Sequence, residues 1–346
     1  MRLSADFDKK MYFETDVSVV IPVCNAERYI AQCLDSILRQ TLKSIEIICV
    51  DDGSSDATAD ILANYACRDE RITVLSQPNC GAGAARNNGM THAAGKYIIF
   101  LDGDDVFEPD MLQSLFDKAE DTRADAVICA ADAFSDVTGE KVSSNWEMPA
   151  DAFKGCDAFH PEDMSDCMFQ MIQGWPWDKL FRTAYLRSEG LSYPDLANTN
   201  DMVFVFQAMV LAQRVAVVRD VLVHRRVCNS ESISNSRETA WECPYIAVRD
   251  VIDAFEKHCV MSVYSQSLCV WILDFLLWHL TTLKGEAQKC CYKAMQREWL
   301  PALKLDRHSA SAYPRSQYIQ MKLIGFLPYT IFMWLKKMRN RINRRR

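Results

Sequence analysis

Residues 17–52 read VSVVIPVCNAERYIAQCLDSILRQTLKSIEIICVDD and decide the fold of the first third of the chain. The β-branched run Val17–Pro22 is typical of a strand buried on both faces. The apolar residues that follow Asn25 recur at helical spacing, and Asn25 itself can cap a helix. Ile45–Val50 is a second buried strand, and it ends abruptly in two acids. Strand, helix and strand in succession predict a parallel sheet covered by helices.

The same alternation continues to residue 130 and then weakens. We expect further strands at 72–75, 97–101 and 124–130, and helices at about 54–66, at 81–94 and from Pro109. After a loop-rich stretch at 146–176, the pattern predicts a strand at 215–224 and helices at 178–190, 201–212, 242–258 and 263–283. The fold class is therefore α/β with a helical C-terminal extension. In such sheets ligands bind at the carboxyl ends of the strands, where each polar motif below begins.

Charge is unevenly distributed along the chain. The 346 residues carry a formal charge of −7, yet residues 315–346 contain nine Lys or Arg and no acid. Residues 1–314 therefore carry −16, since −7 less the tail's +9 is −16. So acidic a body would repel a polyphosphate backbone, which argues against nucleic-acid binding. Residues 1–12 are polar and mixed in charge, unlike a secretory signal, and predict a cytoplasmic protein.

The first polar motif is Val50-Asp51-Asp52-Gly53-Ser54, where a buried strand ends in two acids. Carboxylates at a strand end can accept hydrogen bonds from a nucleobase or a ribose. Asp-Gly and Ser are also ordinary turn residues, and Ser can cap the helix that follows. The motif alone leaves a nucleoside contact and a capped turn equally open.

The second motif is Leu101-Asp102-Gly103-Asp104-Asp105, with three carboxylates after another apolar strand. Crowded carboxylates raise one another's pKa unless a cation lies among them. Oxygen ligands suit Mg²⁺ or Mn²⁺, which typically take one or two carboxylates and complete their coordination with substrate phosphates. The alternative is an acidic loop that caps the helix beginning near Pro109.

The third motif runs from Gly81 to Gly89 and includes Arg86. Small residues let a backbone approach a ligand, and the amino end of a helix favours phosphate. Close packing of a helix on the sheet is the structural alternative. A dinucleotide fingerprint is disfavoured, because its glycines should follow the first strand and none occurs there before Gly53.

These motifs, in this order, resemble glycosyltransferase family 2. The run Val19–Asn25 with Glu27 is similar to the family's opening, and residues 36–41, 50–54, 85–89 and 101–105 follow at matching spacing. The resemblance is dense over 16–130 and sparser to about 235. It implies the GT-A fold, a Rossmann-like and mostly parallel sheet with helices on both faces. It also implies a nucleotide-sugar donor, a Mn²⁺ or Mg²⁺ ion and inversion at the anomeric carbon.

On this resemblance the chain divides into consecutive parts. Residues 1–15 are a lead-in and 16–236 a catalytic domain, with a nucleotide-sugar half at 16–130 and an acceptor half at 131–236. Residues 237–314 are a helical extension and 315–346 a basic amphipathic tail. The Gln-x-x-Arg-Trp motif of processive members is absent from the sequence, so we expect one sugar per encounter.

Site residues carried over by motif fall into two groups. The nucleotide-sugar contacts are Pro22, Asn25, Glu27, Asp52, Arg86 and Asp102. The metal site is Asp104 with Asp102, Asp104 being the expected direct ligand.

Outside these motifs, two segments could add to the site. The basic run His224-Arg225-Arg226 could meet the diphosphate from a flexible segment ending near Ser236, which adds Arg226 to the nucleotide-sugar contacts. Trp175-Pro176-Trp177 could stack on a sugar face or simply pack in the core.

An inverting transfer needs a carboxylate that takes the proton of the acceptor hydroxyl. In the family this base often belongs to a Glu-Asp pair at a helix start, and here the matching residues are Asn200 and Asp201. Asp201 is therefore the expected base, while Asn200 departs from the usual Glu. That departure removes a like charge beside Asp201, so its pKa would be raised less than usual. A plain helix cap is the alternative role for Asp201.

The tail combines an apolar run at 323–335 with a polybasic end. About thirteen residues are too few to span a bilayer, which takes about twenty. Such a segment can instead lie on an anionic inner leaflet, so we expect peripheral membrane contact through 318–346. A helix docked on the catalytic domain with a solvated basic end is the alternative.

The expected function is an inverting, non-processive glycosyltransferase of the hexosyl or N-acetylhexosaminyl type. Its donor would be a nucleoside-diphosphate sugar, most simply a UDP-sugar. Its acceptor would be a glycan or a lipid-linked hydroxyl in the synthesis of a surface polysaccharide. The alternatives are a non-catalytic nucleotide-sugar-binding subunit and a sugar nucleotidyltransferase.

Overall fold

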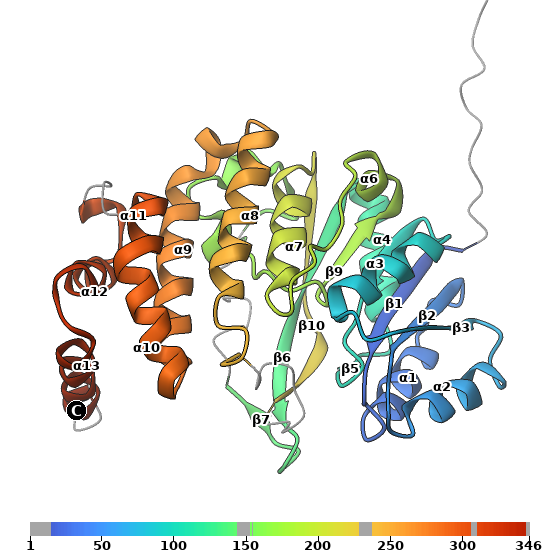
Figure 1. Ribbon diagram of the computed structural model, residues 1–346. Coiled ribbons are helices and arrows are strands. Elements are labelled where there is room, and N and C mark those ends of the chain that lie inside the picture. The colour runs from blue at the N-terminus through green and yellow to red at the C-terminus, as the bar shows by residue number, and fades with distance from the viewer. Residues whose placement is uncertain (1–14, 144–152, 154, 228–236, 306–309, 344–346) are drawn as a thin grey trace, which may run out of the picture. The chain divides into compact units, whose positions relative to one another are not determined.

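The computed structural model describes residues 15–143, 153, 155–227, 237–305 and 310–343 (Figure 1). Expectations for residues 1–14, 144–152, the segment ending at Ser236 and the final three arginines lie outside the described residues. The chain forms two compact units that alternate along the sequence. The first comprises Met1–Phe159, Trp175–Tyr193 and Ala212–Val227; the second comprises His160–Gly174, Pro194–Leu211 and Cys228–Arg346.

The first unit is built on one mixed β-sheet with the strand order β3-β2-β1-β4-β9-β6-β10-β5. Strands β3, β2, β1 and β4 are parallel to one another, as the strand and helix alternation predicts. β7 pairs with β6 and β8 with β10, both antiparallel. The strands are β1 Val17–Val23, β2 Ile45–Asp52, β3 Ile72–Gln77, β4 Tyr97–Phe100, β5 Val106–Phe107, β6 Ala126–Ser135, β7 Lys141–Val142, β8 Ala158–Phe159, β9 Lys179–Arg182 and β10 Val215–Val227.

Helices cover both faces of this sheet. Alternate residues of β1 point to opposite sides, and buried residues occur on both, so both faces must be covered. Val17, Val19 and Ile21 join one fully buried cluster with the apolar sides of α1 (Ile30–Leu38), α2 (Thr58–Ala66) and α4 (Met111–Thr122). Val20 faces the other way, where it meets Gly89 of α3 (Ala82–His92). The GT-A expectation of a layered sheet with helices on both faces is therefore confirmed.

The helix predicted over 178–190 is wrong in its first half. β9 and the short helix α6 (Thr183–Ser188) occupy this segment, and β9 pairs antiparallel with both β4 and β6. Leu180 and Phe181 are fully buried there. Two sheet neighbours satisfy the backbone of a four-residue strand, a tertiary effect that the local helical pattern does not contain.

The second unit is helical among its described residues. Its elements are η1 Pro161–Met164, α5 Met168–Met171, α7 Asn200–Val210, α8 Cys243–Lys257, α9 Met261–Thr282, α10 Gly285–Ala294, the π-helical turn η3 Met295–Trp299, α11 Leu300–Leu303, η5 Ala310–Ala312, α12 Arg315–Phe326 and α13 Tyr329–Asn343. The helices predicted at 201–212, 242–258 and 263–283 are confirmed as α7, α8 and α9. Rings of Phe169, Phe206, Phe255 and Tyr264 form the centre of its core.

α9 is the one helix in the described part of the chain that is long and apolar enough to cross a membrane. Half of its apolar window is buried inside the unit, and the core helix of a globular protein has the same length and composition. Ser267 on α9 donates a hydrogen bond to Gln170 and accepts one from the backbone of Phe169. These contacts are those of a helix in the core of the second unit.

Candidate active site

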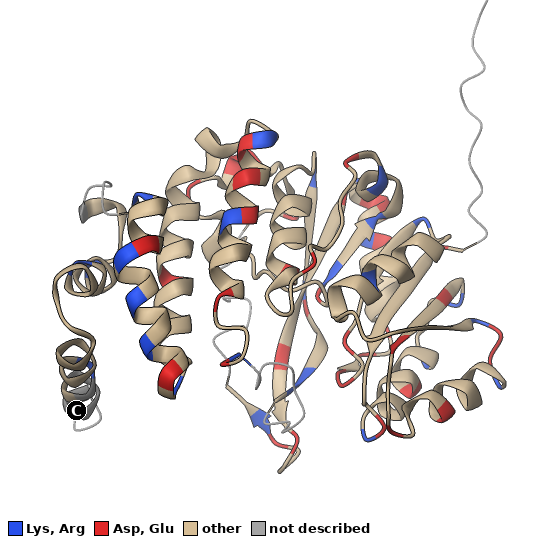
Figure 2. Cartoon of the chain, in the orientation of Figure 1, with Lys and Arg blue, Asp and Glu red and all other residues tan. Residues whose placement is uncertain are grey.

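The carboxyl ends of β1, β2 and β4 meet at one edge of the sheet, because the three strands are parallel neighbours. The motifs singled out in the sequence begin there, at residues 24–29, 51–57 and 101–105. Figure 2 shows acidic residues gathered in these loops, at the lower right of the first unit. The shared edge explains why motifs that are far apart in the sequence can form one site.

The loops after β1 and β2 are joined by hydrogen bonds in both directions. The Asn25 Oδ1 atom accepts from the Ser55 N–H at 2.8 Å, and the Asn25 N–H donates to the Ser54 hydroxyl at 3.0 Å. Glu27 Oε2 likewise accepts from the Ala57 N–H at 2.9 Å. Asn25 does not cap the first helix as predicted, because its side chain holds the loop after β2 instead. Asn25 and Glu27, both expected to contact the nucleoside, thus hold the two loops together at this edge.

Asp52 is buried and its carboxylate is fully engaged. Its Oδ1 atom accepts hydrogen bonds from Gln77 Nε2 at 2.9 Å and from the Cys80 N–H at 2.8 Å. Its Oδ2 atom accepts from the Gly81 N–H at 2.8 Å. Gln77 Oε1 in turn accepts from Asn88 on α3. Asp52 therefore fixes the start of α3 against the end of β2.

The glycines of the third motif serve packing and backbone geometry. Gly81 has a φ of +88°, a conformation that side chains rarely adopt, and this directs its N–H toward Asp52. A Cβ atom at Gly89 would come within 2.4 Å of Val20 Cγ1, so only glycine allows α3 to lie this close to β1. The close-packing alternative raised for this motif therefore holds at Gly89, whereas Gly81 is required by its backbone conformation.

Arg86 projects from α3 into a buried ion pair. Its Nη2 atom lies 2.8 Å from Asp102 Oδ1, and the arginine side chain is 5% exposed against 27% for the aspartate. The guanidinium also lies 5.3 Å from the centre of the Tyr193 ring. Asn87 exchanges two 2.8 Å hydrogen bonds with the backbone of Tyr193, which keeps that ring in place. The sequence did not single out Tyr193, which no motif marks.

The loop after β4 is clamped by Arg226 at the end of β10. The Arg226 Nε atom donates to the Asp104 carbonyl at 2.8 Å, and the Arg226 N–H donates to Asp105 Oδ1 at 2.8 Å. The guanidinium also bonds Asp136 at 2.9 Å and Gln32 at 2.6 Å. Arg226, predicted from the sequence to contact the nucleotide-sugar, therefore holds the loop after β4, here called the carboxylate loop. The Arg226 side chain is 8% exposed.

Asp105 is the most buried carboxyl of this loop. Its Oδ2 atom has no hydrogen-bond partner among the described residues. Burial and the adjacent Asp104 carboxylate raise the pKa of Asp105 well above its usual value, while Arg225 opposes the shift. Arg225 itself lies over the rings of Trp175 and Trp177. The loop therefore holds a buried carboxyl whose second oxygen is not satisfied by hydrogen bonds among the described residues.

His224 bridges two carboxylates instead of facing a ligand. Its Nδ1 atom lies 2.6 Å from Asp132 on β6, and its Nε2 atom lies 2.9 Å from Glu108. Partial burial disfavours the charged imidazole, but the bonds to Asp132 and Glu108 outweigh it and raise the pKa of His224 above its usual 6.5. Both ring nitrogens are occupied, so the histidine of the basic run stabilises the sheet.

The two tryptophans follow the packing alternative. Trp177 is 2% exposed and belongs to the buried cluster of the first unit, with Trp175 packed against it. Beside them the fully buried Lys179 bonds the Trp175 carbonyl at 2.8 Å and Asp178 Oδ1 at 2.6 Å. This segment therefore forms part of the core under Arg225.

The expected base, Asp201, belongs to the second unit. It lies in the first turn of α7, one residue after Asn200, the first helical residue. Asn200 is buried and its Nδ2 atom donates to the Leu196 carbonyl at 3.0 Å. The residue before the helix is Thr199, so Asp201 is not the capping residue of α7. A carboxylate in a first turn is favoured by the helix dipole.

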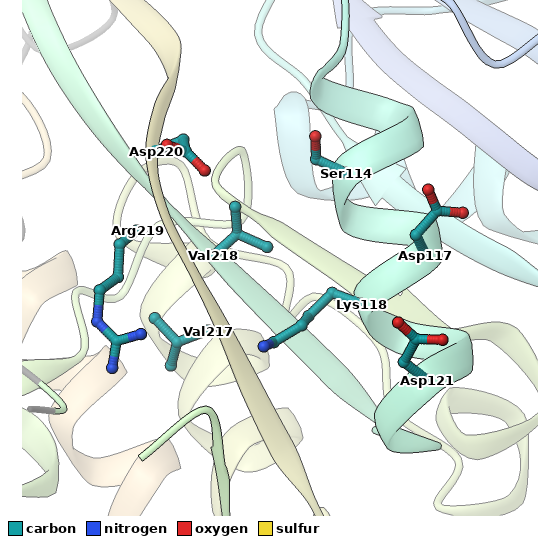
Figure 3. A pocket seen from close by; sticks show the side chains of 8 residues that line it. All are labelled: Ser114, Asp117, Lys118, Asp121, Val217, Val218, Arg219 and Asp220. Atoms are coloured by element: carbon teal, nitrogen blue, oxygen red, sulfur yellow. The ribbon is translucent and has the colours of Figure 1, made fainter. Parts of the chain in front are cut away.

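A surface hollow of the first unit lies away from these motifs (Figure 3). Its two cations, Lys118 and Arg219, both pair with Asp157, at 3.4 and 2.9 Å. No residue of the predicted site lines it. The lining residues are Ser114, Asp117, Lys118, Asp121, Val217, Val218, Arg219 and Asp220.

The carboxylate loop fits a divalent cation only in part. Among the described residues, no group of three or more His, Cys, Asp or Glu side chains is arranged to hold a metal. Asp102 and Asp104 nonetheless lie within electrostatic reach of Asp105, whose second oxygen is buried and unpartnered. Such a loop suits a cation held by one or two carboxylates and completed by substrate phosphate oxygens.

Comparison with known proteins agrees with this fold. The sheet and its helices have the GT-A fold: the crystal structure of S. aureus TarS in complex with UDP-GlcNAc matches at a TM-score of 0.67 and 21% identity, over 90% of both chains. Residues 18–184 match the model of Glycosyl transferase family 2. The matched residues make up just under half of this chain.

Two further proteins extend the comparison. EpsH of Bacillus subtilis, which is named as a glycosyltransferase, is 35% identical over 230 residues, which cover 65% of each chain. The chain spans smaller shares of other curated relatives. A Pyrobaculum calidifontis mannosyltransferase solved with GDP-Man and Mn²⁺ matches at a TM-score of 0.52 and 15% identity, over 90% of this chain and 87% of that one.

Proposed function

We propose that this chain is an inverting, non-processive glycosyltransferase that moves one sugar from a nucleoside-diphosphate sugar to an acceptor hydroxyl. The observation that carries the proposal is the shared edge of β1, β2 and β4. There Asp52, the Arg86–Asp102 pair and the Asp104 loop meet on a family 2 domain. The product would be a surface polysaccharide or a related glycan.

The donor would bind across this edge with its nucleoside near Pro22, Asn25, Glu27 and Asp52. The side chains of Asn25 and Asp52 are occupied within the protein, so they would act by fixing the loops whose backbone meets the base. TarS was solved with UDP-GlcNAc, which supports a UDP-sugar and a hexosyl or N-acetylhexosaminyl group for this chain. Arg86 would hold Asp102 in place for the ribose and diphosphate.

The diphosphate would lie beside Asp104 and Asp102, held with a Mn²⁺ or Mg²⁺ ion. When bound, the ion offsets the negative charge that develops on the leaving diphosphate. The mannosyltransferase solved with GDP-Man and Mn²⁺ supports this for a chain of the same fold. Arg226 would keep Asp104 in position through its 2.8 Å bond to the Asp104 carbonyl.

Asp201 would take the proton of the acceptor hydroxyl as that oxygen attacks the anomeric carbon. Its place in the first turn of α7 favours the carboxylate over the acid. The Asp201→Asn variant keeps the shape of the side chain but removes its basicity. We expect a loss in kcat of about 10² to 10⁴, the usual contribution of a general base. Retention of full activity would remove Asp201 from the mechanism.

The donor and the ion can be tested together. Purified protein is incubated with a panel of nucleoside-diphosphate sugars and Mn²⁺, with and without chelator, and nucleoside-diphosphate release is followed. Release from one donor, abolished by chelator and by Asp104→Ala, would support both assignments. Asp117→Ala is the matched control, since it removes an exposed carboxylate that lines the separate hollow.

Other outcomes would favour a different function. Donor binding by calorimetry without transfer to any acceptor would favour a nucleotide-sugar-binding subunit. Exchange of pyrophosphate into the donor would favour a sugar nucleotidyltransferase. An NMR assignment of the product's anomeric carbon would test inversion directly, because retention of configuration contradicts a single displacement.

The proposed location is the cytoplasmic side of the cell membrane, with peripheral contact through residues 318–346. The nine basic residues and no acid in 315–346 support this location. A lipid-linked acceptor would then lie within reach of the enzyme.

A further inference from the structure

The last two helices of the second unit each have a docked side. The Tyr292 hydroxyl on α10 donates to the Leu327 carbonyl at 2.8 Å, at the break between α12 and α13. The Tyr292 ring also lies 5.2 Å from the Phe332 ring. Met321, Ile324 and Phe332 are almost fully buried. Helices α12 and α13 are therefore docked on the second unit, and the Leu327 carbonyl between them is held by α10.

The opposite side of α13 is apolar and uncovered. Ile331, Trp334, Leu335 and Met338 follow the spacing i, i+3, i+4 and i+7, which places them on one helix face. They are 46%, 58%, 37% and 42% exposed. Phe326, the last residue of α12, is 83% exposed. These five residues are the tail apolar face. Large apolar side chains gathered on one exposed face mark an interaction site.

The two tail helices carry only positive charge in their own sequence. Residues 315–346 carry nine Lys or Arg and no acid. In Figure 2 no acidic residue lies on α12 or α13, whereas α8 and α10 carry both signs. Apolar and aromatic side chains beside a cationic cluster are typical of helices that lie in the interface of an anionic bilayer, where Trp is enriched.

We propose that the tail apolar face inserts into the headgroup region of an anionic membrane, with Phe326 and Trp334 as its main anchors. The basic residues of 315–346 attract the negative lipid surface. Docking on the second unit and membrane contact are thus compatible, because they use opposite sides of α13. The inference rests on the proposed membrane location but not on sugar transfer, since binding is measured without donor or acceptor.

The test is sedimentation of the full-length protein with lipid vesicles. We expect binding to vesicles that contain phosphatidylglycerol, weak binding to pure phosphatidylcholine and release as salt is raised. The double variant Phe326→Ser/Trp334→Ser should bind these vesicles at least about tenfold more weakly, because two large apolar groups no longer enter the interface. Ile246→Ser is the matched control: it removes an apolar side chain of α8 that is 42% exposed, and it should bind normally.

A second variant separates insertion from surface attraction. Trp334→Phe keeps an aromatic anchor, so it should bind vesicles but lose part of the fluorescence quenching by brominated lipid. Unchanged binding by the double variant, or equal binding to neutral vesicles, would overturn the proposal. Self-association without vesicle binding would also overturn it and assign the face to a second copy. Vesicle binding by a protein that fails to transfer sugar would leave this inference intact and reject only the enzymatic one.

Discussion

The loops after β2 and β4 end at the same edge of the sheet and use their acids in opposite ways. After β2, Asp52 accepts three hydrogen bonds from its own chain. After β4, Asp104 and Asp105 crowd each other, and the buried Oδ2 of Asp105 has no partner among the described residues. Arg86 and Arg226 hold this second loop from outside.

The difference indicates a structural role for the acids after β2 and a ligand-binding role for the acids after β4. A carboxylate whose lone pairs are filled by backbone N–H groups fixes a loop and gains little from a ligand. A crowded group of carboxylates gains more, because a cation among them relieves their mutual repulsion. The loop after β2 is therefore expected to control stability, and the loop after β4 to control activity.

Of the residues in these two loops, Asp104 is expected to show the largest effect on activity. Asp104→Ala should lower kcat about 10² to 10³-fold, the usual cost of removing one preorganised electrostatic contact from an active site. The unfolding free energy should change by less than about 0.5 kcal/mol, because the side chain is partly exposed. Sugar-transfer kinetics and urea denaturation measure the two quantities. A stability loss as large as the one expected at Asp52 would erase the contrast between the loops.

The Arg226 clamp should have the next largest effect. Arg226→Gln removes the bond to the Asp104 carbonyl, so we expect a roughly tenfold loss in kcat and a higher Mn²⁺ concentration for half-maximal rate. Arg226→Lys should not restore either value, because lysine lacks the planar fork that meets several acceptors at once. Titration of activity against Mn²⁺ distinguishes positioning from general destabilisation. An unchanged Mn²⁺ requirement would limit Arg226 to a packing role.

Asp52 provides the complementary test. Asp52→Ala leaves the N–H groups of Cys80 and Gly81 without their acceptor, so we expect the unfolding free energy to fall by about 2 to 3 kcal/mol. Asp60→Ala, an exposed acid in the first turn of α2, should cost well under about 1 kcal/mol. Urea denaturation of both variants gives the comparison. Equal losses would show that Asp52 does not fix this edge.

The smallest expected effect is the pH dependence of the stability that His224 contributes. The pKa of His224 is raised in the folded chain, so the imidazolium stabilises the fold fully below pH 6.5, and this contribution is lost as the pH rises through the raised value. Asp132 and Glu108 face the ring, and Lys141 lies 3.2 Å from Asp132. His224→Gln should therefore cost up to about 1 kcal/mol at pH 6 and less at pH 9. A cost independent of pH would contradict the charged bridge.

The sequence by itself determined the layered α/β fold of residues 17–130 and the position of each polar motif at a strand end. Both follow from local causes. Apolar period and β-branching identify buried strands, and a parallel order brings their ends to one edge. The sequence also determined that the tail is basic and apolar, because composition can be read without knowing any tertiary contact.

Only the tertiary structure decided which partners these residues meet. Arg226 reaches Asp104 and Asp136 across 122 and 90 residues of chain, and His224 reaches Asp132 across 92. The strand β9 forms because two neighbouring strands supply its hydrogen bonds, and α7 joins the second unit although it lies between two strands of the first. Such contacts depend on register and chain path, which no local pattern encodes.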